Sequence, residues 1–307
     1  MKNALVLALS ALVLFLGGSA WLCLFPAIPA DLGGVRNLDS EARRVAIPVG
    51  EGEHVGGWVL RGSNRAVIVL LPGYARDHRR VWRYAQFLKP DGYTIVAVDF
   101  RSALSTHRRP TTLGAFELED AEAVLRWVLA QPKWRQARIG LFGESMGASV
   151  ALAAAAADTQ VAAIAADCPF ATGEMGIRDA FACQLGLPAQ PLTGMAMTVG
   201  RIVTRRDFAA LDSRAALTSM RARPVLLIQT ARGDRFSPEQ VRELEAAAGP
   251  GAEGWTVTDS RHNAIWVDHR RDYETRVRAF FAQHLLGSRT WTLERVDAPA
   301  PAAKAKP

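Results

Sequence analysis

Short apolar segments alternate with longer helix-like segments along most of this chain, and this alternation restricts the fold more than any other feature. After Leu71, each run rich in aliphatic residues is followed by a segment with helical periodicity. Strands that alternate with helices are typical of a mainly parallel sheet with helices on both faces. We therefore expect an α/β fold. The expected strands are residues 43–49, 54–60, 66–71, 94–98, 138–142, 161–165, 225–229 and 255–258, and the expected helices are 81–88, 117–129, 146–157, 238–247 and 273–286.

The first three expected strands are separated only by short stretches that contain turn residues. Pro48, Gly50, Gly52 and Gly62 stand in or between these runs. Such short connections can join antiparallel strands, whereas parallel neighbours need a longer crossover. The three runs therefore predict an antiparallel edge of the sheet.

Residues 170–218 interrupt the alternation because they contain no clear strand. An unstructured loop of this length is improbable within a compact domain. We expect an inserted cap of helices and loops over one end of the sheet, inside a domain that spans residues 42–287. The terminal residues 297–307 are rich in alanine, proline and lysine, have little to bury, and are expected to be disordered.

The N-terminal residues 1–30 form either a membrane anchor or a signal segment. No charged side chain occurs from Ala4 to Ile28, and about 25 helical residues are long enough to cross the hydrocarbon layer. Small residues at 18–20 would suit cleavage by a signal peptidase. The apolar run continues through residues 21–25, which favours an uncleaved transmembrane helix. Both alternatives place the body outside the cytoplasm, either anchored to the membrane or secreted or periplasmic.

Charge and metal-ligand patterns exclude several classes of function. The formal net charge is +7, but the arginines are scattered among acidic residues, which favours a solvated surface over a nucleic-acid-binding face. The three cysteines form no C-x-x-C pair and the six histidines are dispersed, so we expect no metal and no cofactor. Cys168 and Cys183 are either two separate buried thiols, which we favour, or a disulfide in an oxidising compartment.

The strongest chemical signal is the sequence Gly143-Glu144-Ser145-Met146-Gly147. It follows an expected strand and begins an expected helix, which is the context in which G-x-S-x-G forms a nucleophile elbow. Glycine at positions 143 and 147 would let the strand and the helix approach closely. The Ser145 hydroxyl would then project at the carboxyl end of the sheet. We therefore predict Ser145 as a nucleophile.

A serine hydroxyl needs a general base, and the base needs an orienting acid. His262 follows the last expected strand and precedes the last helix, which makes it the best candidate for the base. Asp234 follows the preceding strand and is the preferred acid, with Asp167 as its competitor. Asp99 more simply stabilises the turn after its strand. His78 lies in a loop near the expected site and is a candidate substrate contact.

These motifs resemble those of α/β-hydrolase-fold serine hydrolases, in particular bacterial, membrane-anchored, esterase-like members with a short cap. The resemblance covers about residues 43–286. It implies an eight-stranded sheet in which only the second strand is antiparallel to the rest. It also implies that the backbone N–H groups of Tyr74 and Met146 form an oxyanion hole. The motifs that carry it are Leu70-Leu71-Pro72-Gly73-Tyr74, Asp99-Phe100-Arg101, Gly143-Glu144-Ser145-Met146-Gly147, Gly233-Asp234 and His262-Asn263.

The sequence departs from the family pattern at two loops. Pro72-Gly73 replaces the common His-Gly, which leaves the backbone donors intact. The loop after Asp99 lacks the two glycines that are common in the family, so it carries no information about the substrate.

The expected activity is hydrolysis of a carboxylic ester on a small-molecule acyl substrate, through an acyl-enzyme formed on the Ser145, His262 and Asp234 triad. A peptidase, an amidase or an acyltransferase would use the same three residues, because the leaving group and the acceptor are selected by the pocket. A non-catalytic, anchored binding protein on the same fold is the remaining alternative.

Overall fold

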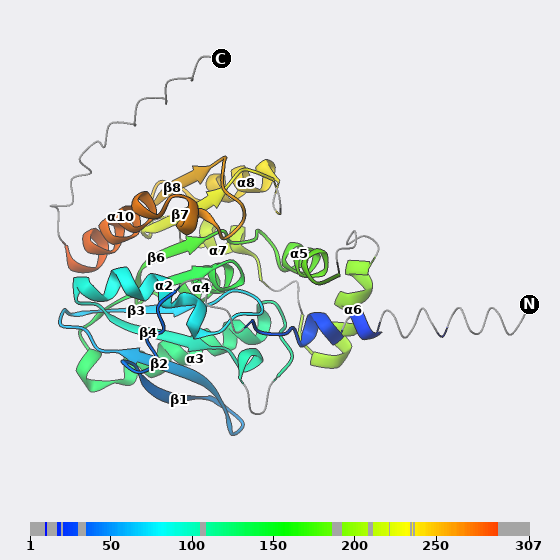
Figure 1. The fold of residues 1–307 in the computed structure, drawn as a ribbon, viewed down its shortest axis with the longest axis horizontal. Helices are drawn as coiled ribbons and strands as arrows, with labels where there is room; N and C mark the ends of the chain where they lie inside the picture. Colours follow the sequence, from blue (N-terminus) through cyan, green and yellow to red (C-terminus); the bar gives the residue numbers. More distant parts are fainter. Residues whose placement is uncertain are drawn as a thin grey trace, which may run out of the picture.

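An eight-stranded sheet forms the centre of the protein (Figure 1). The computed structural model describes residues 10, 17–19, 21–29, 35–104, 109–185, 192–207, 211–220, 222–233, 235 and 237–287. The strand order is β1-β2-β4-β3-β5-β6-β7-β8. The strands are β1 (Arg43–Gly50), β2 (Glu53–Leu60), β3 (Ala66–Leu71), β4 (Thr94–Asp99), β5 (Arg138–Glu144), β6 (Val161–Asp167), β7 (Val225–Thr230) and β8 (Ala252–Val257).

Only β2 runs antiparallel to the other strands, as the resemblance implies. It pairs antiparallel with β1 and with β4, whereas the pairs from β4 onward are parallel. The expectation of a three-stranded antiparallel edge is wrong, because β3 lies between β4 and β5 in the middle of the sheet. Every residue of β3 is buried, whereas β1 has mostly exposed or half-buried residues. A strand without a polar face must be covered on both sides, so it cannot stay at the edge.

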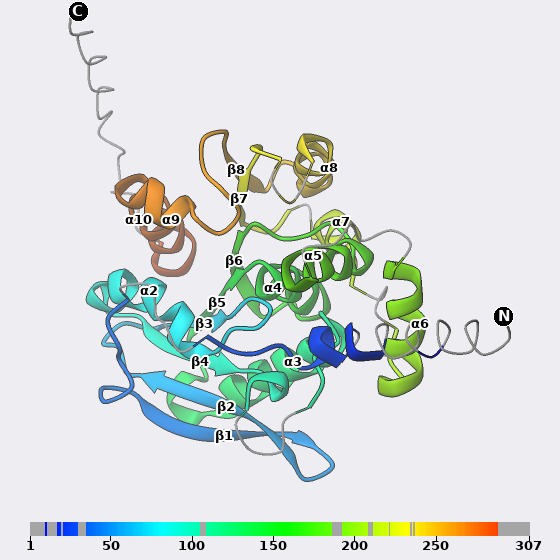
Figure 2. The same cartoon turned by 45° about the vertical axis from the view of Figure 1, so that its right-hand side comes forward.

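The two faces of the sheet are covered by different sets of helices, as Figure 2 shows. Along β3, Val67 and Val69 belong to one hydrophobic core and Ile68 and Leu70 to the other. The first core is covered by α3 (Ala115–Ala130), α4 (Met146–Ala157), α7 (Ser213–Ser219) and α8 (Pro238–Ala248), and the second by α2 (His78–Leu88), α9 (Ile265–Asp268) and α10 (Arg270–Phe281). Short 3-10 helices span Lys89–Asp91, Arg101–Ala103 and Pro132–Trp134, and a π-helical turn spans Ala282–Leu286.

Helices fill the segment between β6 and β7 that interrupts the alternation. They are α5 (Gly173–Leu185), α6 (Leu192–Thr204) and α7. Backbone hydrogen bonds join the two ends of this segment: Gly173 N donates to Leu211 O at 2.7 Å and Ser213 N donates to Ala171 O at 2.9 Å. The segment therefore leaves the sheet and returns to it at one place, and the order of the strands is not disturbed.

The described part of the N-terminal segment includes residues 21–29, which lie against the body. Most of the expected anchor and all of the expected tail at 297–307 lie outside the described residues. Among the helices that the structure describes, none is both long enough and apolar enough to span a bilayer.

Candidate active site

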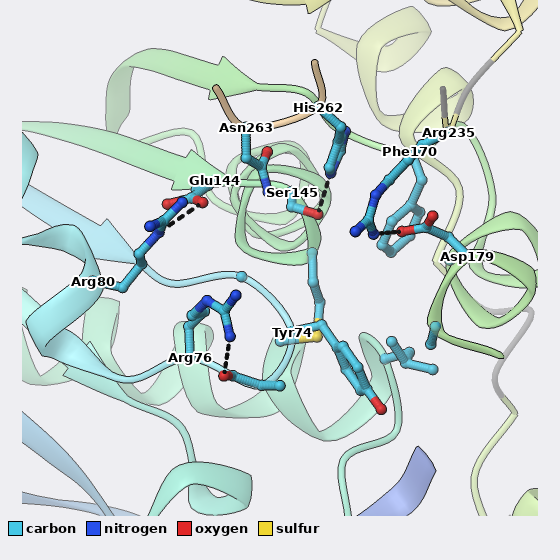
Figure 3. A pocket seen from close by; sticks show the side chains of 16 residues that line it. Tyr74, Arg76, Arg80, Glu144, Ser145, Phe170, Asp179, Arg235, His262 and Asn263 are labelled. Atoms are coloured by element: carbon cyan, nitrogen blue, oxygen red, sulfur yellow. Dashed lines mark hydrogen bonds and ion pairs between the residues drawn. The ribbon is translucent and has the colours of Figure 1, made fainter. Parts of the chain in front are cut away.

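Ser145 occupies a sharp turn between β5 and α4, and its side chain points into a pocket (Figure 3). Its φ is 55° and its ψ is −117°, a backbone conformation that non-glycine residues rarely adopt. A hydrogen bond from Ser145 N to Asp167 O at 2.7 Å ties this turn to β6. Such strain persists only where the surrounding structure determines it, and it is common at functional sites.

The two glycines of the motif are required by close contacts between backbone segments. A Cβ atom at Gly143 would lie 2.1 Å from Gly147 O, and one at Gly147 would lie 2.2 Å from Leu71 O. The atoms in the way belong to the main chain, so no side-chain rotation would relieve these contacts. The strained turn, the start of α4 and the end of β3 therefore form one rigid unit.

His262 lies within hydrogen-bonding distance of the serine. The distance from Ser145 Oγ to His262 Nε2 is 3.1 Å. His262 comes from the loop between β8 and α9, and its neighbour Asn263 has a φ of 59°. Both residues line the same pocket as Ser145. The structure therefore brings together two residues that lie 117 positions apart in the sequence.

Asp234, the preferred acid, lies outside the described residues. The competing Asp167 is buried beneath the sheet end and is not among the residues that line the pocket. Tyr273 Oη donates to its carboxylate at 2.7 Å and Tyr84 Oη at 3.2 Å. Burial, followed by the nearby Glu144 carboxylate, raises the pKa of Asp167 to about 6. The Asp167 side chain is thus engaged on the face covered by α2 and α10.

Glu144 is a buried residue of the motif to which the sequence analysis assigned no role. Its carboxylate accepts hydrogen bonds from Arg80 Nε at 3.3 Å and from Tyr84 Oη at 3.2 Å, and it is 1% exposed. Arg80 and Tyr84 are four positions apart on α2 and therefore share one helix face. The spacing of Arg80 and Tyr84 indicates that both side chains can bind one partner. The sequence does not show that this partner is Glu144 at the end of β5.

Two backbone segments that the resemblance assigns to an oxyanion hole flank Ser145. Tyr74 follows β3, and Met146 is the first residue of α4. Both line the pocket with Ser145. A Cβ atom at Gly73 would lie 3.2 Å from Glu144 O, which shows how closely the Tyr74 loop approaches the serine turn. The N–H group of Met146 lies in the first turn of α4, where N–H groups have no partner within the helix.

The pocket has a mixed lining and a volume of about 200 Å³. Leu113, Phe170 and Ala180 give it apolar surface. Arg235 and Asp179 form an ion pair at 2.6 Å at its edge, and Figure 3 shows this pair beside Phe170. No pattern in the sequence predicts this pair, because it joins α5 to the loop after β7.

His78 and Asp99 have structural roles, so the expectation that His78 contacts the substrate is wrong. His78 is buried, stacks on Trp58 and lies outside the pocket lining. Asp99 accepts hydrogen bonds from His78 N at 2.7 Å and from Trp58 Nε1 at 2.8 Å. It thereby holds the start of α2 against β2, so these hydrogen bonds go to other segments and not to the turn after its own strand, where the sequence predicted them. Cys168 is a free, buried thiol, whereas the side chain of Cys183 lies outside the described residues.

Solved structures share this fold. An esterase from Pyrococcus furiosus matches with a TM-score of 0.66 at 22% identity, covering 84% of this chain and 98% of that one. A 2,6-dihydroxy-pseudo-oxynicotine hydrolase matches with a TM-score of 0.62 at 16% identity, covering 80% of this chain and 68% of that one. The sheet order and these neighbours show that the chain has the α/β-hydrolase fold.

The family follows from the sequence. The chain belongs to the family described as X-Pro dipeptidyl-peptidase (S15 family), whose model matches residues 60–288. An uncharacterized protein of Mycobacterium tuberculosis is 30% identical over 113 residues, which are 36% of this chain and 40% of the relative, so the match spans less than half the length of that relative. The Bacillus subtilis protein YqkD, also uncharacterized, is 25% identical over 245 residues, covering 78% of this chain and 79% of that protein.

Proposed function

We propose that this protein hydrolyses a carboxylic ester of a small molecule through an acyl-enzyme on Ser145. The observation that carries the proposal is the 3.1 Å contact between Ser145 Oγ and His262 Nε2, at a strained turn that opens into a pocket. A serine held this way against an imidazole is an activated nucleophile. The S15 family and the esterase fold neighbour support the same chemistry.

In the proposed mechanism, Ser145 Oγ attacks the carbonyl carbon while His262 Nε2 accepts the hydroxyl proton. Asp234 orients the imidazole and stabilises the imidazolium that forms. The imidazolium then donates its proton to the leaving alcohol oxygen, which leaves an acyl group on Ser145. Water, deprotonated by His262, attacks this acyl group and releases the acid.

The negative charge on the carbonyl oxygen is stabilised by the backbone N–H groups of Tyr74 and Met146. They come from the two sides of the serine turn, and the Met146 N–H also lies at the positive end of α4. One donor of this kind contributes about 3 kcal/mol to lowering the barrier. Glycine at 143 and 147 allows the close backbone contacts that hold the serine turn between these two segments.

A peptidase or amidase activity is the second candidate, and the family description favours it. An acyltransferase would use the same residues with an acceptor other than water. Turnover of matched ester, amide and thioester substrates, with and without an added acceptor alcohol or amine, separates these activities. A non-catalytic binding protein would turn over none of them.

The first prediction concerns the nucleophile. A fluorophosphonate probe is expected to label the wild-type protein, because an activated serine attacks phosphorus as it attacks a carbonyl. Ser145→Ala is expected to abolish both labelling and ester turnover while its melting temperature stays near that of the wild type. Ser213→Ala, which changes a buried serine on α7 that does not line the pocket, is the matched control and should keep the labelling. Equal labelling of Ser145→Ala would exclude Ser145 as the nucleophile.

The second prediction concerns the acid. Asp234→Asn is expected to lower kcat by roughly 10³- to 10⁴-fold, because the imidazole loses the charge that selects its tautomer. Asp167→Asn is expected to lower kcat far less, since its carboxylate is held by Tyr273 and Tyr84. Steady-state kinetics of both variants on one ester decides between them, and the reverse ranking would assign the role to Asp167.

The same Asp167→Asn variant gives a pH-dependent readout of stability. The pKa of Asp167 is about 6 in the folded protein and about 4 in an unfolded chain. The wild type therefore loses stability from this group as the pH rises from about 4 to 6, because the folded state gives up its proton later. Asparagine cannot ionise, so the melting temperature of Asp167→Asn relative to the wild type should rise between pH 4 and pH 7.

The segment of residues 170–218 acts as a cap that sets the acyl-chain preference. Phe170 is 3% exposed and lines the pocket, and a Cβ atom at Gly176 of α5 would lie 2.8 Å from its ring. The ring therefore packs against α5 in the wall of the pocket. Of the described residues of this segment that line the pocket, only Asp179 is charged.

The third prediction follows from this packing. Phe170→Ala is expected to raise kcat/KM for an octanoyl ester relative to an acetyl ester by roughly tenfold, because removal of the ring lengthens the pocket. Phe87→Ala removes a buried aromatic ring that does not line the pocket and should leave the ratio unchanged. A uniform fall for all esters in Phe170→Ala would make the segment a scaffold.

Within residues 1–30, the part before Trp21 acts as an uncleaved membrane anchor that holds the body on the extracytoplasmic side, because residues 21–25 pack into the body. The uncharged run that begins at Ala4 supports this proposal, since about 17 helical residues are enough to span the hydrocarbon layer. The fourth prediction is that the full-length protein pellets with membranes and resists carbonate extraction. A mature protein that starts at Trp21 and is found in the soluble fraction would show that the run is a cleaved signal peptide.

A further inference from the structure

A helical turn at residues 21–25 packs into the wall of the pocket region. Phe25 N donates to Trp21 O at 2.8 Å. Cys23 is 5% and Leu24 is 8% exposed, and both belong to the hydrophobic core that contains Leu113 and Met146. On the outer side of the turn, Trp21 is 62% exposed. The inner side is therefore part of the folded body and cannot be a linker that simply precedes it.

Two hydrogen bonds hold this turn in place. Tyr74 Oη donates to Cys23 O at 2.8 Å, and Thr111 N donates to Leu24 O at 2.8 Å. Carbonyl groups at the end of a helical turn have no partner within it, so these donors satisfy two buried acceptors. In Figure 3 the Tyr74 ring points away from Ser145 and toward the N-terminal ribbon, drawn in blue.

The two residues that donate these hydrogen bonds, Tyr74 and Thr111, each lie in or against a segment of the proposed oxyanion hole. Tyr74 itself carries one of the two proposed N–H groups. Thr111 lies with its Oγ1 4.0 Å from the Sδ atom of Met146, which carries the other, and it also donates to Glu117 at 2.7 Å. The N-terminal turn thus contacts Tyr74 directly and Met146 through one intermediate residue.

We propose that the turn Trp21–Phe25 is a structural component of the active site and that the Tyr74 side chain is a positioning residue, which anchors the oxyanion loop to this turn. The inference rests on the proposed function of the Tyr74 N–H. The Tyr74 loop approaches the serine turn closely at Gly73, so its position relative to Ser145 depends on what holds its far side. A chain shortened to Asp31 would lack this support, whereas cleavage before Trp21 would leave it in place.

The fifth prediction tests this role in the full-length protein. Tyr74→Phe removes only the hydroxyl that binds Cys23 O. It is expected to lower kcat by roughly 3- to 10-fold and leave KM unchanged, because the hydroxyl points out of the pocket. It should weaken a boronic acid inhibitor, whose tetrahedral adduct occupies the oxyanion hole, by the same factor. Unchanged kcat and unchanged inhibitor binding would overturn the proposal.

Tyr93→Phe is the matched control. Tyr93 is a fully buried tyrosine in the opposite core, and its hydroxyl has no hydrogen-bond partner among the described residues. This variant should change neither kcat nor inhibitor binding. If Tyr93→Phe lowers kcat as much as Tyr74→Phe does, the loss reflects general packing and the proposal fails.

A double-mutant cycle identifies the partner of Tyr74. Leu24→Asp places a charge in the core and is expected to release the turn. If Tyr74 acts through this turn, Tyr74→Phe should lower kcat no further in the Leu24→Asp background. Additive losses in kcat would overturn the proposal. Leu24→Ala replaces Leu24→Asp in the cycle if the charged variant does not fold.

These outcomes are distinct from a failure of the proposed function. If the wild type is not labelled by a fluorophosphonate and hydrolyses no ester, amide or thioester, the serine hydrolase proposal itself is wrong. If the wild type is labelled and active but Tyr74→Phe matches it in kcat and inhibitor affinity, only the role of the N-terminal turn is wrong.

Discussion

The structure depends on two neighbouring backbone contacts, where β5, α4 and β3 approach too closely for any side chain. Gly143 faces the carbonyl of Gly147, and Gly147 faces the carbonyl of Leu71. Ser145 lies between these contacts and takes a positive φ. Because Tyr74 follows Leu71 by three residues, the same end of β3 positions both the serine turn and the loop beside it. Displacement of β3 would therefore move the serine and an oxyanion donor together.

A second constraint lies beneath this turn, where two buried carboxylates are neighbours. Glu144 and Asp167 end β5 and β6 and are paired in register. Tyr84 Oη lies 3.2 Å from an oxygen of each. Burial, followed by the nearby Glu144 carboxylate, raises the pKa of Asp167, and hydroxyl donors from α2 and α10 compensate for the burial of its carboxylate. Asp167 ends a strand at the same edge of the sheet as Ser145, but its carboxylate is hydrogen-bonded by Tyr84 and Tyr273 in the core and does not line the pocket.

The sequence was sufficient to predict the fold class, the strand-to-helix turn at Ser145 and the approach of His262 to it, but not the other long-range contacts. The G-x-S-x-G motif is local, and its glycines and its strand-to-helix position can be recognised without knowledge of other segments. The central place of β3 follows from its uniformly apolar residues, yet the short connections around it suggested an edge. His78 and Asp99 also misled, because their pairing brings together the start of α2, β2 and β4. The Arg235–Asp179 pair could not be foreseen, since periodicity carries no information on which loops meet.

The N-terminal turn shows that an apolar run in a sequence does not tell whether its residues lie in a lipid bilayer or in a protein core. Its apolar residues look in sequence like the continuation of an anchor, because hydropathy does not distinguish a lipid from a protein core. In the structure, Cys23 and Leu24 are buried in the body while Trp21 and Leu22 on the same turn are exposed. Backbone hydrogen bonds also place this turn in the protein, since the carbonyls of Cys23 and Leu24 accept hydrogen bonds from Tyr74 and Thr111. These two hydrogen bonds fix residues 21–25 to the folded body. The distance between the body and the residues before Trp21 is therefore set by this turn and not by a free linker.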